Sequence, residues 1–422
     1  MKFLGFIYDL AIWIYTTAIH LAFPLSRKAR LWIRGRKNFE YKFDPAASDP
    51  RIWVHCASLG EFEQGRPLIE GLHSAYPNAR ILLSFFSPSG YEIRKDFPLA
   101  DQVFYLPADT SKNASRLVDS IRPSLVIFVK YEFWYHYMVE LHGRGIPVLM
   151  VSATFRENQV FFKWYASLYR EILGLYTRIF LQDKKSFEIL SMVNPVANME
   201  IAGDTRFDRV VEISRQPPAP ASAFPLGSFD QKLVIVAGST WPKDEEILGH
   251  FMAGFTNEVP IGMVMAPHEV TERHLRRIES LFPGIRRLSR AGGENFPASA
   301  NTLLVDSIGK LAGLYRYGSL AYIGGGFHQG IHNILEAAVY GIPVIFGPDY
   351  SKFNEASDLV RLGGAFSVKN EQDLEVVLFK LISDKSERLR AGKICRDYVL
   401  NGAGATRRIM EYIQGKRFLT RL

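Results

Sequence analysis

Short apolar runs alternate with longer mixed stretches along most of this 422-residue chain. Such runs in the first half cover residues 51–55, 80–86, 124–129, 147–153 and 178–183. They are apolar at nearly every position rather than at every second one, which is typical of strands buried on both faces of a parallel sheet. The stretches between them are long enough for the helices that cover such a sheet. The pattern predicts a doubly wound α/β domain.

A second series of the same kind follows, at residues 232–239, 261–267, 302–306, 320–326 and 343–348. Between the two series, residues 214–230 read "SRQPPAPASAFPLGSFD", a composition that indicates a linker. We therefore predict two Rossmann-like domains, at 43–213 and 231–422, with a last helix that could return to the first. Ligands of such sheets bind beyond the carboxyl ends of the strands, so we expect a cleft between the domains.

The first 42 residues differ from the rest of the chain. Residues 3–25 are nearly all apolar, with Asp9 and His20 as interruptions, and are just long enough to span a bilayer. Seven basic residues and one acid, Glu40, follow between positions 26 and 42 and supply most of the net charge of +8. We predict a membrane-associating helix with a basic segment for anionic lipid, and the bulk of the chain in the cytoplasm. A buried helix that contacts soluble partners is the alternative.

Several charged residues of the first half follow predicted strands. Glu61 comes after the first strand in "HCASLGEFEQG", where it suits either a general base or a helix-capping acid. Glu132 follows the third strand in "VKYEFWY", and its alternative role is an ion pair with Lys130. Arg206, in "AGDTRFD", could reach the cleft or pair with a neighbouring aspartate.

In the second half, the segment "YIGGGFHQGIHNILEAA" ends a strand in glycines and opens a helix at Asn333–Glu336. A carboxylate in the first helical turn can accept hydrogen bonds from a ribose, although a tight turn with a capping acid is the plainer interpretation. Three more strand-end turns hold Ser239-Thr240, Pro267-His268 and Ile308-Gly309-Lys310. This convergence predicts a nucleotide site. The sequence has no phosphate-binding loop, no dinucleotide fingerprint and no evident carboxylate pair for magnesium, so an NTPase, an NAD enzyme and a metal-dependent sugar transferase are not expected.

Taken together, these motifs and "AGSTWPKDEE", "APHEVTER", "DSIGKLAGLY" and "FGPDYSKFNEA" resemble the 3-deoxy-D-manno-octulosonic acid (Kdo) transferases of lipopolysaccharide synthesis. The resemblance implies an inverting glycosyltransferase of the GT-B fold that moves Kdo from CMP-Kdo to a lipid A precursor. It also implies no metal or other cofactor, no nucleic-acid partner, and a place at the cytoplasmic face of the inner membrane. Two cysteines, too few for a disulfide framework, agree with a reducing compartment.

By the same resemblance, Glu61 is the catalytic base, and Glu132 and Arg206 stabilise the transition state. The implied CMP contacts are Pro267, His268, Ile308, Gly309, Lys310, Asn333, Ile334, Leu335 and Glu336. Arg206, His268, Lys310 and Ile334 depart from the residues usual in the family, which are Lys, Arg, Glu and Pro respectively. Two alternatives stay open: a nucleotide-sugar 2-epimerase or hydrolase of the same architecture, and a non-catalytic membrane-bound protein that binds nucleotide or lipid.

Overall fold

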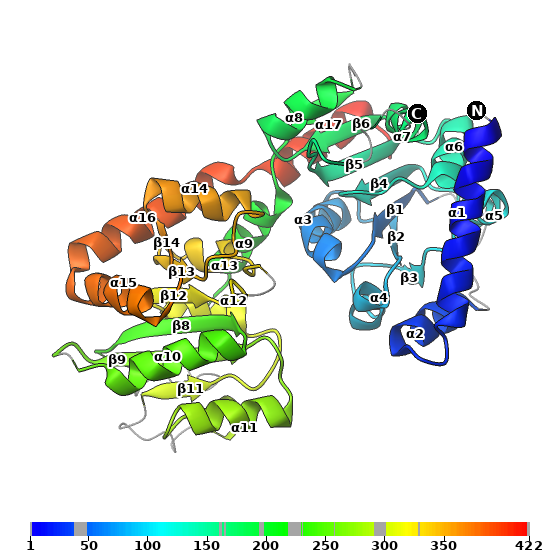
Figure 1. Ribbon diagram of the computed structural model, residues 1–422. Coiled ribbons are helices and arrows are strands. Elements are labelled where there is room, and N and C mark those ends of the chain that lie inside the picture. Colours follow the sequence, from blue (N-terminus) through cyan, green and yellow to red (C-terminus); the bar gives the residue numbers. More distant parts are fainter. Residues whose placement is uncertain are drawn as a thin grey trace. The chain divides into compact units, whose positions relative to one another are not determined.

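The computed structural model in Figure 1 divides the chain into two compact units. Unit 1 comprises Met1–Arg209 and Ala403–Leu422, and unit 2 comprises Val210–Gly402. The structure describes residues 2–37, 49–159, 163, 166–193, 198–217, 229, 231–256, 258–290, 301–327 and 330–419. The predicted boundary between residues 42 and 43 and most of the predicted linker 214–230 lie outside the described residues. The two units are described separately below.

Unit 1 is built on a seven-stranded parallel sheet with the strand order β3-β2-β1-β4-β5-β6-β7. The strands are β1 (Arg51–Cys56), β2 (Arg80–Phe85), β3 (Gln102–Tyr105), β4 (Leu125–Val129), β5 (Val148–Ala153), β6 (Arg178–Leu181) and β7 (Met199–Ile201). The five apolar runs of the first half correspond to β1, β2, β4, β5 and β6. The prediction missed β3 and β7, because both are short edge strands with half-exposed positions that break the apolar pattern.

Helices cover both faces of this sheet. They are α1 (Lys2–Leu21), α2 (Arg27–Arg36), α3 (Leu59–Ala75), α4 (Pro88–Arg94), α5 (Ser111–Ile121), α6 (Tyr135–Gly143), α7 (Ser167–Gly174), α8 (Lys184–Ser191), α9 (Thr205–Arg215, which runs past the unit boundary) and α17 (Ala405–Lys416). Alternate residues of β1 point to opposite faces, so Trp53 joins one core cluster and Ile52 and Val54 join the other. This double burial explains why the inner strands are apolar at most positions on both faces.

The C-terminal helix α17 belongs to unit 1, where it packs on α3. Ile409 and Ile413 of α17 are fully buried in the cluster that also holds Ile52 of β1. The carboxylate of Asp208 accepts hydrogen bonds from the backbone N–H groups of Gly404 and Thr406, which fastens the start of α17. The last helix thus packs in the unit that contains the first strands of the chain.

The helix α1 runs along unit 1 beside α6 (Figure 1). The Tyr8 hydroxyl donates to Asp109, and Asp9 lies 2.6 Å from the imidazole Nε2 of His136 in α6. These contacts explain why Tyr8 and Asp9 place polar groups on that side of the helix. Among the described residues, no helix has both the length and the apolar character needed to cross a membrane.

Unit 2 repeats the architecture, with the parallel strand order β10-β11-β9-β8-β12-β13-β14. The strands are β8 (Leu233–Thr240), β9 (Ile261–Pro267), β10 (Arg286–Arg287), β11 (Thr302–Leu304), β12 (Leu320–Ile323), β13 (Val344–Phe346) and β14 (Ala365–Ser367). The helices are α10 (Pro242–Gly254), α11 (Glu272–Leu281), α12 (Leu311–Leu314), α13 (Leu335–Ala338), α14 (Asn354–Leu362), α15 (Glu371–Ser383) and α16 (Lys385–Gly402). Again the prediction found the inner strands and missed the short β10 and β14.

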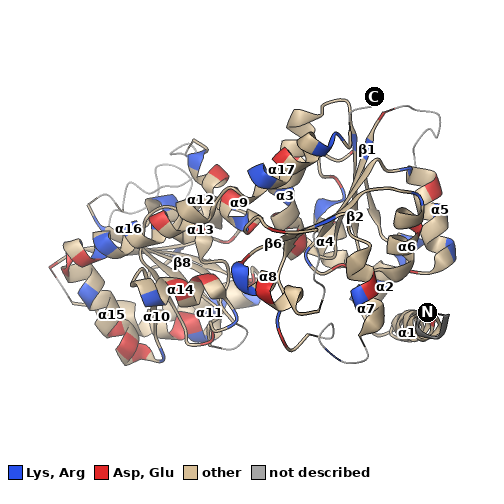
Figure 2. Cartoon of the chain, turned by 90° about the horizontal axis from the view of Figure 1, so that it is seen from above, with Lys and Arg blue, Asp and Glu red and all other residues tan. Residues whose placement is uncertain are grey.

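The two sheets share one topological feature that positions the site. In each sheet the first strand of the unit, β1 or β8, lies in the interior, and the chain builds outward from it in both directions. The strand order therefore reverses between β1 and β4 in unit 1 and between β8 and β12 in unit 2. Ligands of open α/β sheets bind at such switch points, beyond the carboxyl ends of the strands. The outer surfaces of the covering helices, for example α15, carry acidic and basic residues (Figure 2).

Candidate active site

Glu61 and Glu132 follow the two strands that flank the switch point of unit 1. Glu61 lies in the first turn of α3 after β1, and Glu132 lies in the loop after β4, which pairs with β1. Both carboxylates act electrostatically on the buried thiol of Cys56, the last residue of β1. Burial, and then these carboxylates, raise the pKa of Cys56 well above its usual value. The fold thus brings two acids that are 71 positions apart in the sequence to one sheet edge.

The local structure around Glu61 differs from a capping arrangement. Ser58 is the N-cap residue of α3, and its hydroxyl donates to the carboxylate of Glu61 instead of accepting a backbone N–H. A capping box would need both reciprocal backbone bonds, and the described contacts contain neither. Glu63, the neighbouring acid, forms an ion pair with Arg94 at 2.8 Å. Glu61 is half-buried, with its side chain held by Ser58.

The close packing of α3 fixes the position of Glu61 relative to the sheet. A Cβ atom at Gly65 would lie 3.0 Å from Val129 Cγ2 and 3.3 Å from Cys56 Sγ. The glycine therefore allows α3 to approach the ends of β1 and β4. Because a helix is rigid over one turn, this contact also sets where the carboxylate of Glu61 lies.

Glu132 is almost completely buried, at 3% exposure, and its carboxylate has two aromatic neighbours. The indole N–H of Trp134 donates to Oε2, and Nε2 of His55 lies 3.2 Å from the same oxygen, without the alignment of a hydrogen bond. On its other side, His55 Nδ1 lies 2.8 Å from the hydroxyl oxygen of Ser84, which also accepts the indole N–H of Trp53 at 2.7 Å. This chain of buried polar groups holds the carboxylate in one orientation.

Two cations lie near Glu61. Lys130 directly follows β4, and burial lowers its pKa, while the charges of Glu61, Arg206, Asp204 and Arg156 also act on it. Arg206 forms an ion pair with Asp204 at 2.7 Å, which is the alternative that the sequence left open. Its role in stabilising a transition state stays a prediction. The site of unit 1 therefore combines two carboxylates with two cations.

Backbone strain accompanies this arrangement. Lys130 has φ = +74° and Ser152, at the end of β5, has φ = +55°, values that side-chain-bearing residues seldom adopt. The Ser152 hydroxyl lies 2.8 Å from that of Thr205, which in turn donates to the carbonyl of Gln64 in α3. These contacts connect the start of α9, and with it Arg206, to the helix that carries Glu61. Strained residues of this kind concentrate at functional sites.

The switch point of unit 2 also has a strained residue, Ser239, with φ = +53° near the end of β8. The glycine run after β12 packs directly on it. A Cβ atom at Gly324 would lie 2.3 Å from the carbonyl oxygen of Ser239. The glycine therefore allows the backbone after β12 to approach the neighbouring strand end closely.

Three aromatic rings stack at this edge of unit 2. Trp241 lies 4.5 Å from His268, and His268 lies 4.6 Å from His332, with interplanar angles of 20° and 28°. The indole N–H of Trp241 also donates to Nε2 of His332 at 3.2 Å. Burial, with His268 beside it, lowers the pKa of His332 to about 4. At neutral pH this imidazole is therefore uncharged and accepts the indole hydrogen bond.

The other predicted nucleotide contacts fall into two groups. Pro267 ends β9 and is buried, whereas Ile308, Gly309 and Lys310 form an exposed turn after β11, with Ile308 88% exposed. Ile334 and Leu335 are buried, so their side chains belong to the core. The side chains of Asn333 and Glu336 contact each other at 3.2 Å and are half-buried. The structure thus gathers His268, Asn333 and Glu336 at the ends of β9 and β12, with the exposed turn after β11 as a separate element.

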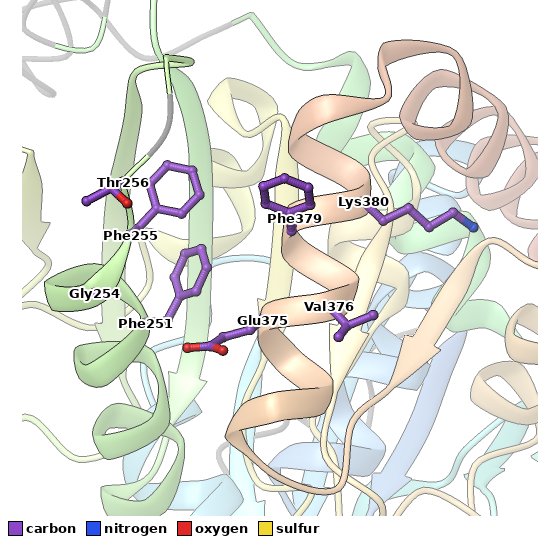
Figure 3. A pocket seen from close by; sticks show the side chains of 8 residues that line it. All are labelled: Phe251, Gly254, Phe255, Thr256, Glu375, Val376, Phe379 and Lys380. Atoms are coloured by element: carbon purple, nitrogen blue, oxygen red, sulfur yellow. The ribbon is translucent and has the colours of Figure 1, made fainter.

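A large pocket of unit 2 lies elsewhere. Figure 3 shows this hollow, of about 540 Å³, between the C-terminal part of α10 and the helix α15. Phe251 and Phe255 face Phe379 and Glu375 across it. Trp241 caps the opposite end of α10, about 20 Å away at 1.5 Å per residue. This pocket is therefore not part of the candidate site.

Comparisons with known proteins agree with this geometry. The sheets match the solved UDP-GlcNAc 2-epimerase of Neisseria meningitidis (TM-score 0.61, 16% identity, covering 86% of this chain and 100% of that one). They also match MurG of Acinetobacter baumannii (TM-score 0.55, 14% identity, 87% and 100%). These likenesses concern the fold alone. They place the chain in the class of proteins with two parallel-sheet α/β units and a GT-B-like fold.

The sequence comparisons, unlike the comparisons of structure, all point to one family. The family model of 3-deoxy-D-manno-octulosonic-acid transferase matches residues 32–209. A 3-deoxy-D-manno-octulosonic acid transferase of Chlamydia muridarum is 28% identical over 80% of each chain, and one of Haemophilus influenzae is 26% identical over 90% of this chain and 91% of its own. Along most of its length the chain is therefore similar to the 3-deoxy-D-manno-octulosonic-acid transferases, the family that its motifs predicted.

Some residues at these sites were not among the predicted site residues. Lys130 was noticed only as a possible partner of Glu132, and His55, Trp241 and His332 received no role. A signal existed for Lys130, because it directly follows a buried strand, as site residues do. None existed for the stack of Trp241, His268 and His332, since its members come from three segments that only the sheet brings together.

Proposed function

We propose that the chain is a Kdo transferase that moves Kdo from CMP-Kdo to a lipid A precursor, with inversion and without a metal ion. The observation that carries the proposal is that Glu61 and Glu132 lie at the neighbouring ends of β1 and β4. The similarity to Kdo transferases along most of the chain supports it. The epimerase alternative is not favoured, because the likeness to solved 2-epimerases rests on the fold, at 13–16% identity. The relatives that match along most of the sequence are transferases.

In the proposed reaction, Glu61 accepts the proton of an acceptor hydroxyl while the oxygen attacks the anomeric carbon of Kdo. The bond from that carbon to the phosphate oxygen breaks, and CMP leaves with the electron pair. One positioned base is sufficient for an inverting transfer. The Ser58 hydroxyl holds the carboxylate of Glu61 in place for this step.

Glu132 and Arg206 are proposed to stabilise the charges that develop during transfer. A buried carboxylate held by Trp134 favours positive charge on the sugar ring, since electrostatic effects are strong where water is excluded. Arg206, with Lys130 nearby, suits the anionic carboxylate of Kdo or the departing phosphate. We add Lys130 to the proposed site on the basis of its position beside Glu61.

Unit 2 is proposed to hold the CMP part of the donor. Glu336 suits the ribose hydroxyls, and the stacked His268 suits the base or the phosphate. The buried side chains of Ile334 and Leu335 leave only their backbone groups for such a contact. The exposed turn at Ile308, Gly309 and Lys310 supplies the remaining predicted contacts.

The decisive experiment is incubation of the purified chain with CMP-Kdo and tetraacyl lipid A precursor, with mass analysis of the lipid. We expect the addition of Kdo, in the presence of EDTA as in its absence. An increase in lipid mass that requires a divalent metal would contradict the metal-free part of the proposal. Conversion of UDP-GlcNAc to its 2-epimer, without any change in the lipid, would favour the alternative.

The helix α1 is proposed to hold the enzyme at the cytoplasmic face of the inner membrane. Its outer side exposes large apolar side chains, among them Phe6 at 64% and Trp13 at 63%. Basic residues of α2 follow, and each cation near an anionic surface contributes about 1 kcal/mol. The double variant Phe6→Ser/Trp13→Ser should leave membranes in flotation assays while Tyr8 and Asp9 still hold α1 on unit 1. Flotation equal to that of the wild-type chain would refute this role.

A further inference from the structure

A cavity of about 340 Å³ lies in unit 1 between α1 and the carboxyl edge of the sheet. Its lining comes from four places: Ile12 and Tyr15 of α1, Phe86 after β2, Ala108 and Asp109 after β3, and Trp134 after β4. The volume falls within the range of about 300–1,000 Å³ that is typical of small-molecule sites. The cavity lies at the sheet edge that carries Glu61 and Glu132.

The lining of this cavity is almost entirely apolar. Asp109 is the one charged residue in it, and three donors already engage its carboxylate: the Tyr8 hydroxyl and the backbone N–H groups of His136 and Tyr137. The indole N–H of Trp134 is bonded to Glu132. A polar ligand would therefore lose its bonds with water and gain few in return, whereas an apolar ligand fits.

The surroundings of the cavity suit one part of an amphiphile. Tyr15, Phe86 and Trp134 form a continuous aromatic wall, with ring centroids 6.0 Å and 4.9 Å apart. The half-buried guanidinium of Arg36 lies 4.9 Å from the Phe86 ring and donates to three backbone carbonyls. Earlier in α2, Arg27, Lys28 and Arg34 are exposed. An apolar wall next to a cluster of cations matches a lipid that has an acyl chain and an anionic head group.

Trp134 connects the cavity with the candidate catalytic site, which favours the acceptor lipid over bulk phospholipid as the ligand. Its ring forms part of the cavity wall, and its N–H holds the carboxylate of Glu132. A chain in the cavity would thus place its own head group within reach of the candidate catalytic carboxylates. Bulk phospholipid at this position would compete with the acceptor.

We propose that this cavity binds one acyl chain of the acceptor lipid and thereby positions the acceptor hydroxyl for transfer. The inference rests on the proposed function and adds a binding site to it. The site combines α1 with three strand ends, so α1 contributes to acceptor recognition as well as to any membrane contact.

The test fills the cavity from the α1 side. Ile12→Trp places an indole where the chain would lie, and Ile93→Trp makes the same change on the surface of α4, where Ile93 is 58% exposed. In detergent micelles we expect Ile12→Trp to raise the KM for tetraacyl lipid A precursor at least tenfold. The KM for its fully deacylated form and the Kd for CMP should stay within twofold, and Ile93→Trp should behave as the wild-type chain does.

A second measurement does not depend on catalysis. Dansyl-undecanoic acid should gain fluorescence with the wild-type chain and with Ile93→Trp but not with Ile12→Trp. The tetraacyl precursor should displace it at least tenfold better than phosphatidylglycerol micelles or the deacylated precursor. If Ile12→Trp fails to fold, Ala108→Leu fills the same cavity from the loop after β3 and carries the same expectations.

The outcomes separate the two proposals. Normal Kdo transfer with equal acceptor KM in Ile12→Trp and Ile93→Trp overturns the acyl-chain site and leaves the transferase function intact. Equal displacement of the probe by phosphatidylglycerol also overturns it, in favour of a bulk-lipid site. Absence of Kdo transfer by the wild-type chain overturns the proposed function, and the acceptor assignment falls with it.

Discussion

The two units of this protein share a fold but differ in the chemistry at their switch points. In unit 1 the ends of β1 and β4 carry Glu61, Lys130 and Glu132, all beside one another in a partly buried site. In unit 2 the ends of β8, β9 and β12 carry a strained serine, a glycine run and stacked imidazoles. One topology thus supports a site of opposed charges in one unit and a largely neutral aromatic surface in the other.

Unit 2 also contains buried acids, but their carboxylates form hydrogen bonds that stabilise the fold. Asp244 accepts hydrogen bonds from Trp241 N–H, the Tyr322 hydroxyl and Gly325 N–H. Glu245, fully buried, contacts Thr240, His274 and Arg277. The comparison indicates that a carboxylate near a switch point suits proton transfer only when its hydrogen-bond partners leave it accessible. Glu61, which is half-buried with Ser58 as its hydrogen-bond partner, meets this condition.

The largest expected effect comes from Glu61→Gln. Loss of a positioned base typically lowers the rate about 10²–10⁴-fold, so Kdo transfer should nearly disappear while CMP binding, assigned to unit 2, is unchanged. Glu63→Gln is the matched control, since Glu63 pairs with Arg94 and should leave transfer intact. Turnover of Glu61→Gln at the wild-type rate, with a stability loss of about 0.3–1 kcal/mol, would identify Glu61 as a helix-capping acid.

The reciprocal change in unit 2 is Glu336→Ala. Charge-assisted hydrogen bonds contribute about 1.5–3 kcal/mol, so CMP affinity measured by calorimetry should fall about ten- to a hundredfold. The KM for the acceptor, assigned to unit 1, should not change. Unaltered CMP affinity in a folded variant would remove Glu336 from the site. A change in the KM for the acceptor would contradict the assignment of donor binding to unit 2 and acceptor binding to unit 1.

A smaller effect is expected from Ser84→Ala, beneath the site of unit 1. The variant removes the acceptor of the buried indole N–H of Trp53 and the hydrogen-bond partner of His55 Nδ1, which costs about 1–3 kcal/mol. We expect a lower urea midpoint and a lower kcat, because His55 faces Glu132, with unchanged CMP binding. Ser89→Ala on α4 should change neither quantity. A destabilised Ser84→Ala variant with full kcat would show that the chain of polar groups supports the core alone.

The smallest effect concerns pH in unit 2. The pKa of His332, about 4 in the folded chain, lies below the value of about 6.5 usual for an unfolded chain. The unfolded state therefore binds more protons between these values, and stability is lost as the pH falls from about 6.5 to 4. After allowance for solvent screening we expect a loss of about 1–2 kcal/mol.

Amide hydrogen exchange in β8, β9 and β12, corrected for intrinsic rates, measures this loss. The groups that act on His332 are His268 and the Trp241 N–H, and His332→Gln should flatten the pH dependence. His250→Gln changes an exposed histidine of the same unit that pairs with Glu371 and should not. If stability depends on pH equally in the wild-type chain and in His332→Gln, His332 is not the source of the stability loss at low pH.

The class of fold could be predicted from the sequence, because strands that are buried on both faces appear in it as continuous apolar runs. Strands β4 and β5 are buried at every position, and all of their residues except Ser152 are apolar, since helices cover both of their faces. The edge strands β3, β7, β10 and β14 left no such mark, because one side of each has no neighbouring strand. The motif around Glu61 and that around Glu336 were visible for a related reason: each breaks an apolar run at the point where a strand ends.

Only the tertiary structure decided which of these strand ends are neighbours. Glu61 and Glu132 meet because β1 pairs with β4 rather than with β3, and Trp241, His268 and His332 stack because β8 lies between β9 and β12. The same holds for α1, whose Asp9 pairs with His136, more than a hundred residues away. Apolar patterns record whether a residue is buried, a property of one position. Pairing across a sheet depends on two distant segments at once, and no local pattern records it.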